Sequence, residues 1–238
     1  MRDAKTAFDY LTGALTGGDK PVAVGQKFSG DGAPINCPGY TTICHVDPSS
    51  DAFAALVAAQ GDLKTGPSAA AFTFMPAASL HMTIFEGVID YARMPDRWPQ
   101  HLALDATIAH ATHDAERRLT EAPFERTFKV RPVGVFGGFS IAMAGVNDTE
   151  EWRLRQTRDA LRDALNLHRP DHEAYQFHIT LAYLLRWLSP DEAHQVIDLS
   201  RSVAAALVKD MPTLSLGPIE LCGFTTMHHF APIARIGA

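Results

Sequence analysis

Two short segments of the chain repeat one pattern, in which a histidine and a threonine alternate with apolar residues. The first segment reads LHMTI and the second reads FHITL. Side chains in a β-strand point alternately to opposite faces, so each segment can bury its apolar residues and present the other two. The pattern therefore predicts two strands, one with His81 and Thr83 on its polar face and the other with His178 and Thr180.

Two imidazoles on one surface are suited to acid–base chemistry on a single reacting group. Histidine titrates near pH ~6.5, so one ring can be neutral and its partner charged near neutral pH. The neutral ring then takes a proton from water, the charged ring gives one to the leaving oxygen, and the threonine hydroxyls bind phosphoryl oxygens. This chemistry needs no metal or other cofactor. A single histidine of this kind is typical of a packed structural side chain, but two matching segments favour catalysis.

The rest of the chain mixes strands and helices without strict alternation. Apolar and β-branched runs predict strands at 40–46, 71–75, 80–86, 126–136, 139–146, 175–185, 213–221 and 222–229. Capped Ala-rich or amphipathic runs predict helices at 51–64, 104–119, 149–166 with Thr149 as the cap, and from Ser189 onward. This order favours an α+β protein with antiparallel sheets over a doubly wound fold.

The first part of the chain differs in composition from the rest. Residues 12–39 are rich in Gly, Pro, Asp and Lys, which predicts loops. We therefore expect a loop-rich N-terminal segment, residues 1–39, followed by one domain, residues 40–238. The loops are also candidates for a lid over a binding site.

The net charge of −6 argues against a surface that holds long nucleic acid, which requires a basic stripe. A small nucleotide or an RNA terminus remains a suitable partner. The three cysteines, Cys37, Cys44 and Cys222, are odd in number and lack CxxC spacing, so a disulfide framework is not expected. The start of the sequence lacks the apolar core of a secretory signal, and no apolar run approaches membrane-spanning length. We expect a cytoplasmic monomer that does not bind membranes.

The paired pattern and its surroundings resemble a known superfamily. The strings CPGYTTICHV, SLHMTIFEGV, PDHEAYQFHITLAYLLRWL and GPIELCGF are similar to those of two-histidine phosphoesterases, in an uncharacterised bacterial branch. That superfamily includes the LigT-like RNA cyclic phosphodiesterases, also called 2′-5′ RNA ligases, plant-type cyclic phosphodiesterases and a nucleotide-binding domain of an anchoring protein. The resemblance extends from about Cys37 to Phe224.

The resemblance implies a bilobal fold and a site between the lobes. Each lobe would carry a small antiparallel sheet with outer helices, and a pseudo-twofold axis would relate the two lobes. The catalytic histidines of the family correspond to His81 and His178, and its hydroxyl residues correspond to Thr83 and Thr180. The implied activity is hydrolysis of a cyclic phosphate or a 2′-5′ phosphodiester on a nucleotide or RNA end.

Four further residues are candidates for binding the substrate. Tyr183 resembles an aromatic residue often found after the second tripeptide, although strict alternation turns it away from His178 unless a bulge intervenes. Tyr40 and Phe85 can stack on a base, but each is at least as well explained as core. Arg186 can bind a phosphate, and a solvated ion pair is the simpler alternative.

Three functions remain open at this level. The first is the metal-independent phosphodiesterase described above. The second is a nucleotide-binding module of the same fold with little or no catalysis. The third is a metal-dependent hydrolase that uses His110 and His113, which lie three residues apart on a predicted helix, although a solvated helix face explains them better.

Overall fold

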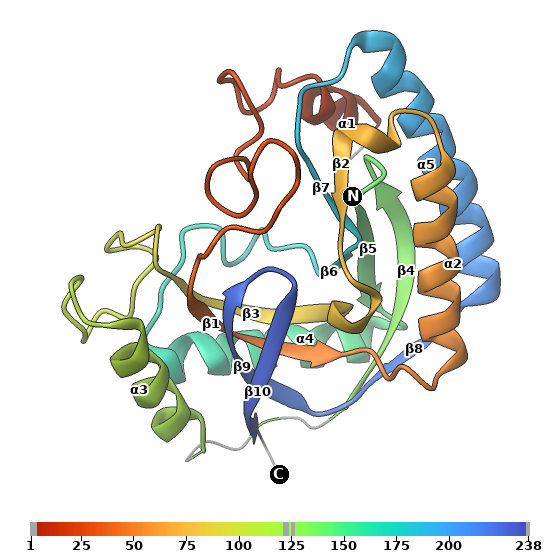
Figure 1. Cartoon of the computed structure of the whole chain (residues 1–238). Helices are drawn as coiled ribbons and strands as arrows, with labels where there is room; N and C mark the ends of the chain where they lie inside the picture. Colours follow the sequence, from red (N-terminus) through yellow and green to blue (C-terminus); the bar gives the residue numbers. More distant parts are fainter. Residues whose placement is uncertain (1–3, 121–123, 125–126, 237–238) are drawn as a thin grey trace.

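The computed structural model describes residues 4–120, 124 and 127–236, and it has the α+β class expected from the sequence. An eight-stranded antiparallel sheet has the order β10-β9-β1-β3-β6-β5-β4-β8, and β2 and β7 form a separate pair (Figure 1). The strands are β1 (Gly39–His45), β2 (Phe72–Phe74), β3 (His81–Ile89), β4 (Phe128–Phe136), β5 (Ser140–Gly145), β6 (His178–Thr180), β7 (Ala182–Leu184), β8 (Leu214–Leu216), β9 (Ile219–Thr226) and β10 (His229–Ile236). The helices are α1 (Ala4–Leu11), α2 (Asp51–Thr65), α3 (Ile108–Thr120), α4 (Asp148–Leu165) and α5 (Pro190–Asp210).

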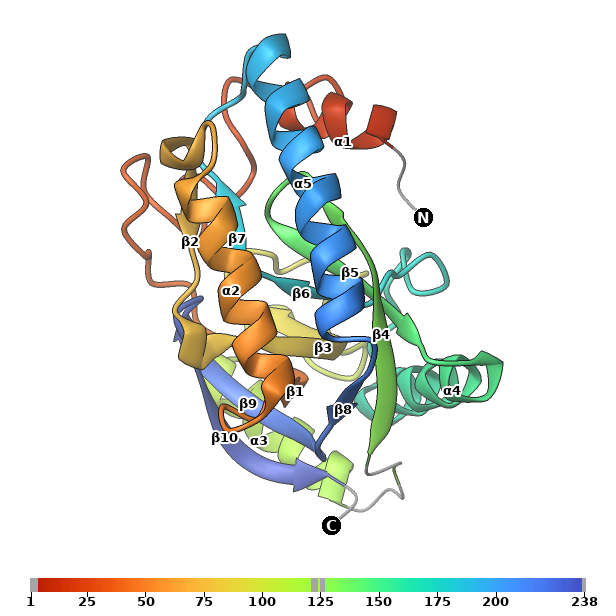
Figure 2. The ribbon, with the colours of Figure 1, turned by 90° about the vertical axis from the view of Figure 1, so that its right-hand side faces the viewer.

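The large sheet curls, and its two four-stranded halves meet where β3 pairs with β6. Helices α2 and α5 lie side by side on the outer face of the β4–β5 half (Figure 2). Helix α4 packs on β3 and β5, and α3 packs on α4, β1 and β10. Both His-x-Thr strands belong to this one continuous sheet, so the expected pair of separate small sheets related by a pseudo-twofold axis is not confirmed.

Local capping signals explain where the helices begin, with two corrections. The side chain of Ser189 accepts from the Glu192 amide, and the two residues form a capping box at the predicted start of α5. Helix α4 begins at Asp148, because the side chain of Asn147, and not that of Thr149, accepts from the Glu150 amide. Helix α3 begins at Ile108, later than predicted.

Three predicted strands, 175–185, 213–221 and 222–229, differ from the structure. The segment 175–185 splits at Leu181, whose carbonyl accepts from the side chain of Gln60 at 2.9 Å, and the break separates β6 from β7. The last hairpin turns after Thr226, so the predicted boundary between 221 and 222 is wrong and Cys222 lies inside β9. Residue 126, the predicted start of a strand, lies outside the described residues; β4 begins at Phe128.

The N-terminal segment contains α1, which packs on α5, and then continues as turns and loops. Phe28 is fully buried and anchors the loops, with its ring centroid 5.1 Å from that of Tyr183. The loops therefore lie against β7. Among the described residues, the helices are all too short or too polar to span a bilayer.

Candidate active site

The first His-x-Thr segment opens β3 and follows the predicted alternation. His81 and Thr83 are half-buried, whereas Met82 and Ile84 are fully buried. The alternation changes after Thr83, because β1 pairs Ile43 with Thr83 but Thr42 with Phe85, which leaves Ile84 as an extra residue. This bulge turns Phe85 into the core and brings Glu86 to the same side as His81 and Thr83.

The second segment forms β6 and lies directly beside the first. Met82 pairs with Ile179 in antiparallel register. In an antiparallel pair, the residues on either side of this pair also lie opposite each other. His81 is therefore opposite Thr180, and Thr83 is opposite His178. The four polar residues thus form a square with the histidines on one diagonal, where Cα atoms are about 7–8 Å apart. A phosphoryl group fits between two imidazoles at that spacing.

Both imidazoles are held in the same way by a backbone carbonyl two residues earlier. Nδ1 of His81 lies 2.7 Å from the carbonyl oxygen of Ser79, and Nδ1 of His178 lies 2.8 Å from that of Gln176. A carbonyl can only accept, so Nδ1 carries the hydrogen in each ring. Nε2 is therefore the nitrogen on each ring that gains or loses a proton.

The surroundings of His81 favour its neutral form. Burial lowers the pKa of His81 to about 4, and the nearby His45 and His178 also lower it, while the Ser79 carbonyl opposes the shift. The ring centroid of His81 lies 6.2 Å from that of His45 and 4.4 Å from that of Phe230. At neutral pH the imidazole of His81 is thus a proton acceptor.

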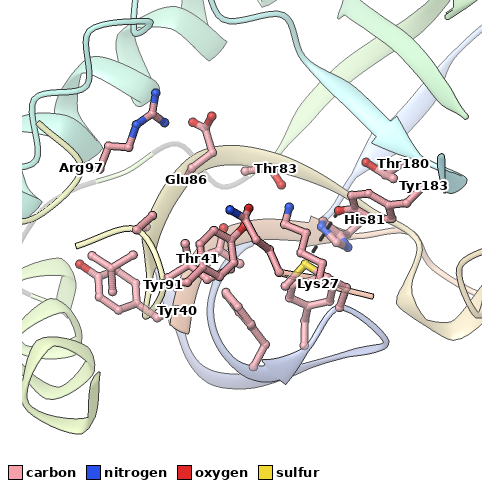
Figure 3. A pocket seen from close by; sticks show the side chains of 18 of the residues that line it. Lys27, Tyr40, Thr41, His81, Thr83, Glu86, Tyr91, Arg97, Thr180 and Tyr183 are labelled. Carbon is pink, nitrogen blue, oxygen red and sulfur yellow. Dashed lines mark hydrogen bonds between the residues drawn. The ribbon is translucent and has the colours of Figure 1, made fainter. Parts of the chain in front are cut away.

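All four tripeptide residues line one pocket of about 740 Å³, within the range of small-molecule sites. The pocket follows β3 from His81 to Ile89. Nine residues of strand cover roughly 26 Å from first to last at about 3.3 Å per residue. Figure 3 shows His81 and Thr180 at one end of the pocket and Arg97 at the other. The cavity is therefore longer than a single phosphate requires.

Tyr183 lines the pocket together with the histidines. In a regular strand Tyr183 would point away from His178. The break at Leu181 between β6 and β7 interrupts the alternation and allows Tyr183 to face the same pocket. Tyr40 also lines the pocket but is only 1% exposed, and its hydroxyl has no hydrogen-bond partner among the described residues. Its ring packs so closely against Gly87 that a Cβ there would overlap it. Tyr40 is thus part of the pocket wall.

Two of the predicted substrate-binding residues, Phe85 and Arg186, do not line the pocket. Phe85 is fully buried in the core, because the bulge at Ile84 turns its ring inward, and it cannot stack on a base. Arg186 is exposed and forms an ion pair with Glu192, with 2.6 Å between Nη2 and Oε1. Arg186 therefore forms the solvated ion pair that was the simpler alternative, and it lies outside the pocket lining.

Sequence patterns missed Lys27, which reaches the pocket from the N-terminal loops (Figure 3). Its ammonium lies 5.0 Å from the centroid of the Tyr183 ring. Burial alone lowers the pKa of Lys27, but Tyr183 and Tyr91 more than offset this and leave the pKa raised. Lys27 therefore adds a fixed positive charge. A lysine inside a loop of mixed composition has no periodic signal that could have revealed this role.

The sequence patterns also missed Glu86. Its carboxylate lines the pocket and forms an ion pair of 2.9 Å with Arg158, which is 1% exposed. The guanidinium carbon of Arg158 lies 3.6 Å from the centroid of the Tyr175 ring. Only the bulge at Ile84 brings Glu86 to this face, and a bulge is set by strand pairing.

Two groups of side chains have the spacing of a metal site among the described residues, and neither contains His110 or His113. They are His45, Glu220 and Cys222, and Asp159, His172 and Glu173. The pKa of the Cys222 thiol is raised to about 12 by burial and the nearby Glu220, which keeps it protonated. His113 has a side chain that is 81% exposed. The helix face proposed for a metal-dependent hydrolase is thus a solvated surface.

Comparisons with known proteins agree with this geometry. Residues 27–137 match the family model 2H-phosphodiest, described as a domain of unknown function (DUF1868). The crystal structure of a conserved protein of unknown function from Agrobacterium tumefaciens is 30% identical, with a TM-score of 0.91 over 97% of this chain and 98% of that one. A search of curated proteins found no match.

Proposed function

The chain belongs to the two-histidine phosphodiesterase family (2H-phosphodiesterase, DUF1868), and from this premise we propose that it hydrolyses a phosphodiester on a small nucleotide or an RNA end without a metal. The bond is a 2′,3′-cyclic phosphate or a 2′-5′ linkage. One observation carries the proposal: the four polar residues of the two tripeptides line one pocket from adjacent strands.

His81 acts as the general base in this proposal. Its pKa of about 4 keeps the imidazole neutral at neutral pH, and Nδ1 already holds the hydrogen that the Ser79 carbonyl accepts. Nε2 of His81 takes a proton from water while the water oxygen forms a bond to phosphorus. His178 is left as the general acid.

His178 completes the step by protonating the leaving oxygen. The bond between phosphorus and that ribose oxygen breaks, its electron pair stays on the oxygen, and Nε2 of protonated His178 supplies the proton. The product of a cyclic phosphate is a phosphomonoester. Proton return through water from His81 to His178 restores both rings.

Negative charge on the phosphoryl oxygens is met by three groups. The hydroxyls of Thr83 and Thr180 donate hydrogen bonds from the two remaining corners of the square. The Lys27 ammonium supplies the positive charge from the N-terminal loops. Acid, base and cation all come from the protein, which supports a reaction independent of divalent ions.

Hydrolysis of nucleoside 2′,3′-cyclic phosphates in excess EDTA tests this function. We expect turnover that His81→Ala and His178→Ala each reduce at least ~100-fold, whereas His113→Ala, on an exposed helix face, has the wild-type rate. Circular dichroism melts verify that the variants fold. Turnover that survives both active-site substitutions contradicts the proposal, and tight nucleotide binding without turnover favours the nucleotide-binding alternative. A cytoplasmic location, a monomeric state and the division at residue 39 stay predictions.

A further inference from the structure

We propose that the end of the pocket farthest from His81 binds a second phosphate group of the substrate, through Arg97 and Arg169. This inference rests on the proposed function and defines its substrate class. The substrate is then a nucleotide with a phosphate besides the one that reacts. A 5′-phosphate and the next phosphodiester of an RNA end both provide that chemistry.

The hydrogen-bond donors of Arg97 are almost unused. Within the described residues its guanidinium makes one ion pair, 4.0 Å from Asp171, and its side chain is 31% exposed. Arg93, four residues earlier in the same loop, contacts Asp90 at 2.5 Å and the carbonyls of Leu104 and Ala106 at 2.7 and 2.6 Å. The loop thus provides hydrogen-bond acceptors for Arg93, whereas Arg97 lines the pocket with N–H donors available for a ligand.

Arg169 is similarly under-used although it is more deeply placed. Its side chain is 11% exposed, and Nε lies 3.5 Å from Asp171 without a geometrically acceptable hydrogen bond. Nη1 lies 3.5 Å from the carbonyl of Gly87, the limit of a hydrogen bond. Buried donors without good partners cost free energy, so an acceptor from a ligand stabilises this arrangement.

The local charge also favours an anion. Arg97 and Arg169 share the single carboxylate of Asp171, which leaves one excess positive charge at this end. Glu86, the carboxylate nearest along β3, is already neutralised by Arg158 at 2.9 Å. Guanidinium groups bind phosphate oxygens through paired N–H donors, which makes them better suited to a second phosphate than to a base or sugar.

The position of the two arginines sets the geometry of the ligand. Arg97 lies across the pocket from His81 and Thr180 in Figure 3, with Glu86 and Thr83 between them. A phosphate held between the histidines therefore cannot also contact Arg97. A nucleotide lying along β3 can place its reacting phosphate at one end and its other phosphate at the other.

Three substrates test the inference: a nucleoside 2′,3′-cyclic phosphate, the same compound with a 5′-phosphate, and a dinucleotide with a terminal cyclic phosphate. We expect kcat/KM to be at least ~10-fold higher for one or both extended substrates. Arg97→Gln and Arg169→Gln should each bring this ratio close to one, and Arg97→Lys should retain part of it. Arg201→Gln, on the exposed face of α5, removes the same charge elsewhere and should keep the ratio.

Equal kcat/KM for all three substrates overturns the inference, as does a ratio that Arg97→Gln and Arg169→Gln leave intact. Calorimetry with products separates this failure from failure of the proposed function. If none of the three substrates is hydrolysed, tighter binding of a nucleoside 3′,5′-bisphosphate than of the 3′-monophosphate, lost in Arg97→Gln, still supports the second site. Equal binding of the two products overturns it.

Discussion

The lowered pKa of His81 makes the stability of the protein depend on pH in a calculable way. In the unfolded chain a histidine titrates near pH ~6.5, and in the folded chain burial holds the pKa of His81 at about 4. When the pH falls below the pKa of histidine in the unfolded chain, the unfolded chain binds a proton at this position and the folded chain does not. The contribution of His81 to the free energy of unfolding is therefore complete above pH ~6.5 and is lost progressively as the pH falls to ~4.

The magnitude follows from the two pKa values. At pH ~4.5 the unfolded histidine is almost fully protonated, whereas about a quarter of the folded molecules carry the proton on His81. His81 alone therefore lowers the free energy of unfolding by about 2.5 kcal/mol between pH ~7.5 and pH ~4.5. His81→Gln removes the titration, so the variant should lose about 2.5 kcal/mol less than the wild type over the same interval.

Urea denaturation at the two pH values measures this difference, and NMR titration of the His81 ring measures the pKa directly. His113→Gln serves as the matched control, because the side chain of His113 is 81% exposed and lies on an outer helix face. Equal losses of stability in the wild type and His81→Gln, or an NMR titration midpoint near ~6.5, refute the reasoning. The acid limb of the profile of kcat/KM against pH should lie near the same low value.

Three further substitutions have expected outcomes that follow from local packing and charge. Gly87→Ala places a Cβ against the carbonyl and ring of Tyr40 and should lower the free energy of unfolding by about 1–3 kcal/mol, measured by urea denaturation. Lys27→Met should lower kcat/KM by ~10-fold or more with little change in melting temperature, and an unaltered rate would remove Lys27 from the phosphate site. Arg158→Met leaves the Glu86 carboxylate without its buried partner and should destabilise the fold by about 3–5 kcal/mol. A melting temperature unchanged in Arg158→Met would contradict that assignment.

Local sequence explains a large part of the fold. Alternation in LHMTI and FHITL predicts strands with a histidine and a threonine on one face, and burial of Met82 and Ile179 confirms this. Ser189 and Glu192 predict the start of α5, because a capping box depends on residues within one helical turn. These interactions are short in range, so the residues that determine them are neighbours in the chain.

Pairing between distant segments decided the features that the sequence did not reveal. The bulge at Ile84 depends on how β1 pairs with β3, and it turns Phe85 into the core and brings Glu86 to the pocket. At the break, the Leu181 carbonyl accepts hydrogen bonds from Gln60 and Met75, both more than a hundred residues away in the chain. Strand patterns do not specify either irregularity, because the same alternation is compatible with several registers.

The chemical content of the candidate site was thus determined by the sequence itself, while its extent was decided by tertiary structure. The two tripeptides already contain the two imidazoles and two hydroxyls, and any strand would present them on one face. Their square arrangement requires the pairing of Met82 with Ile179. Lys27 and Arg97, the cations that line the two ends of the pocket, come from loops. The positions of these loops depend on burial and on contacts with distant parts of the chain, so no local sequence period predicts them.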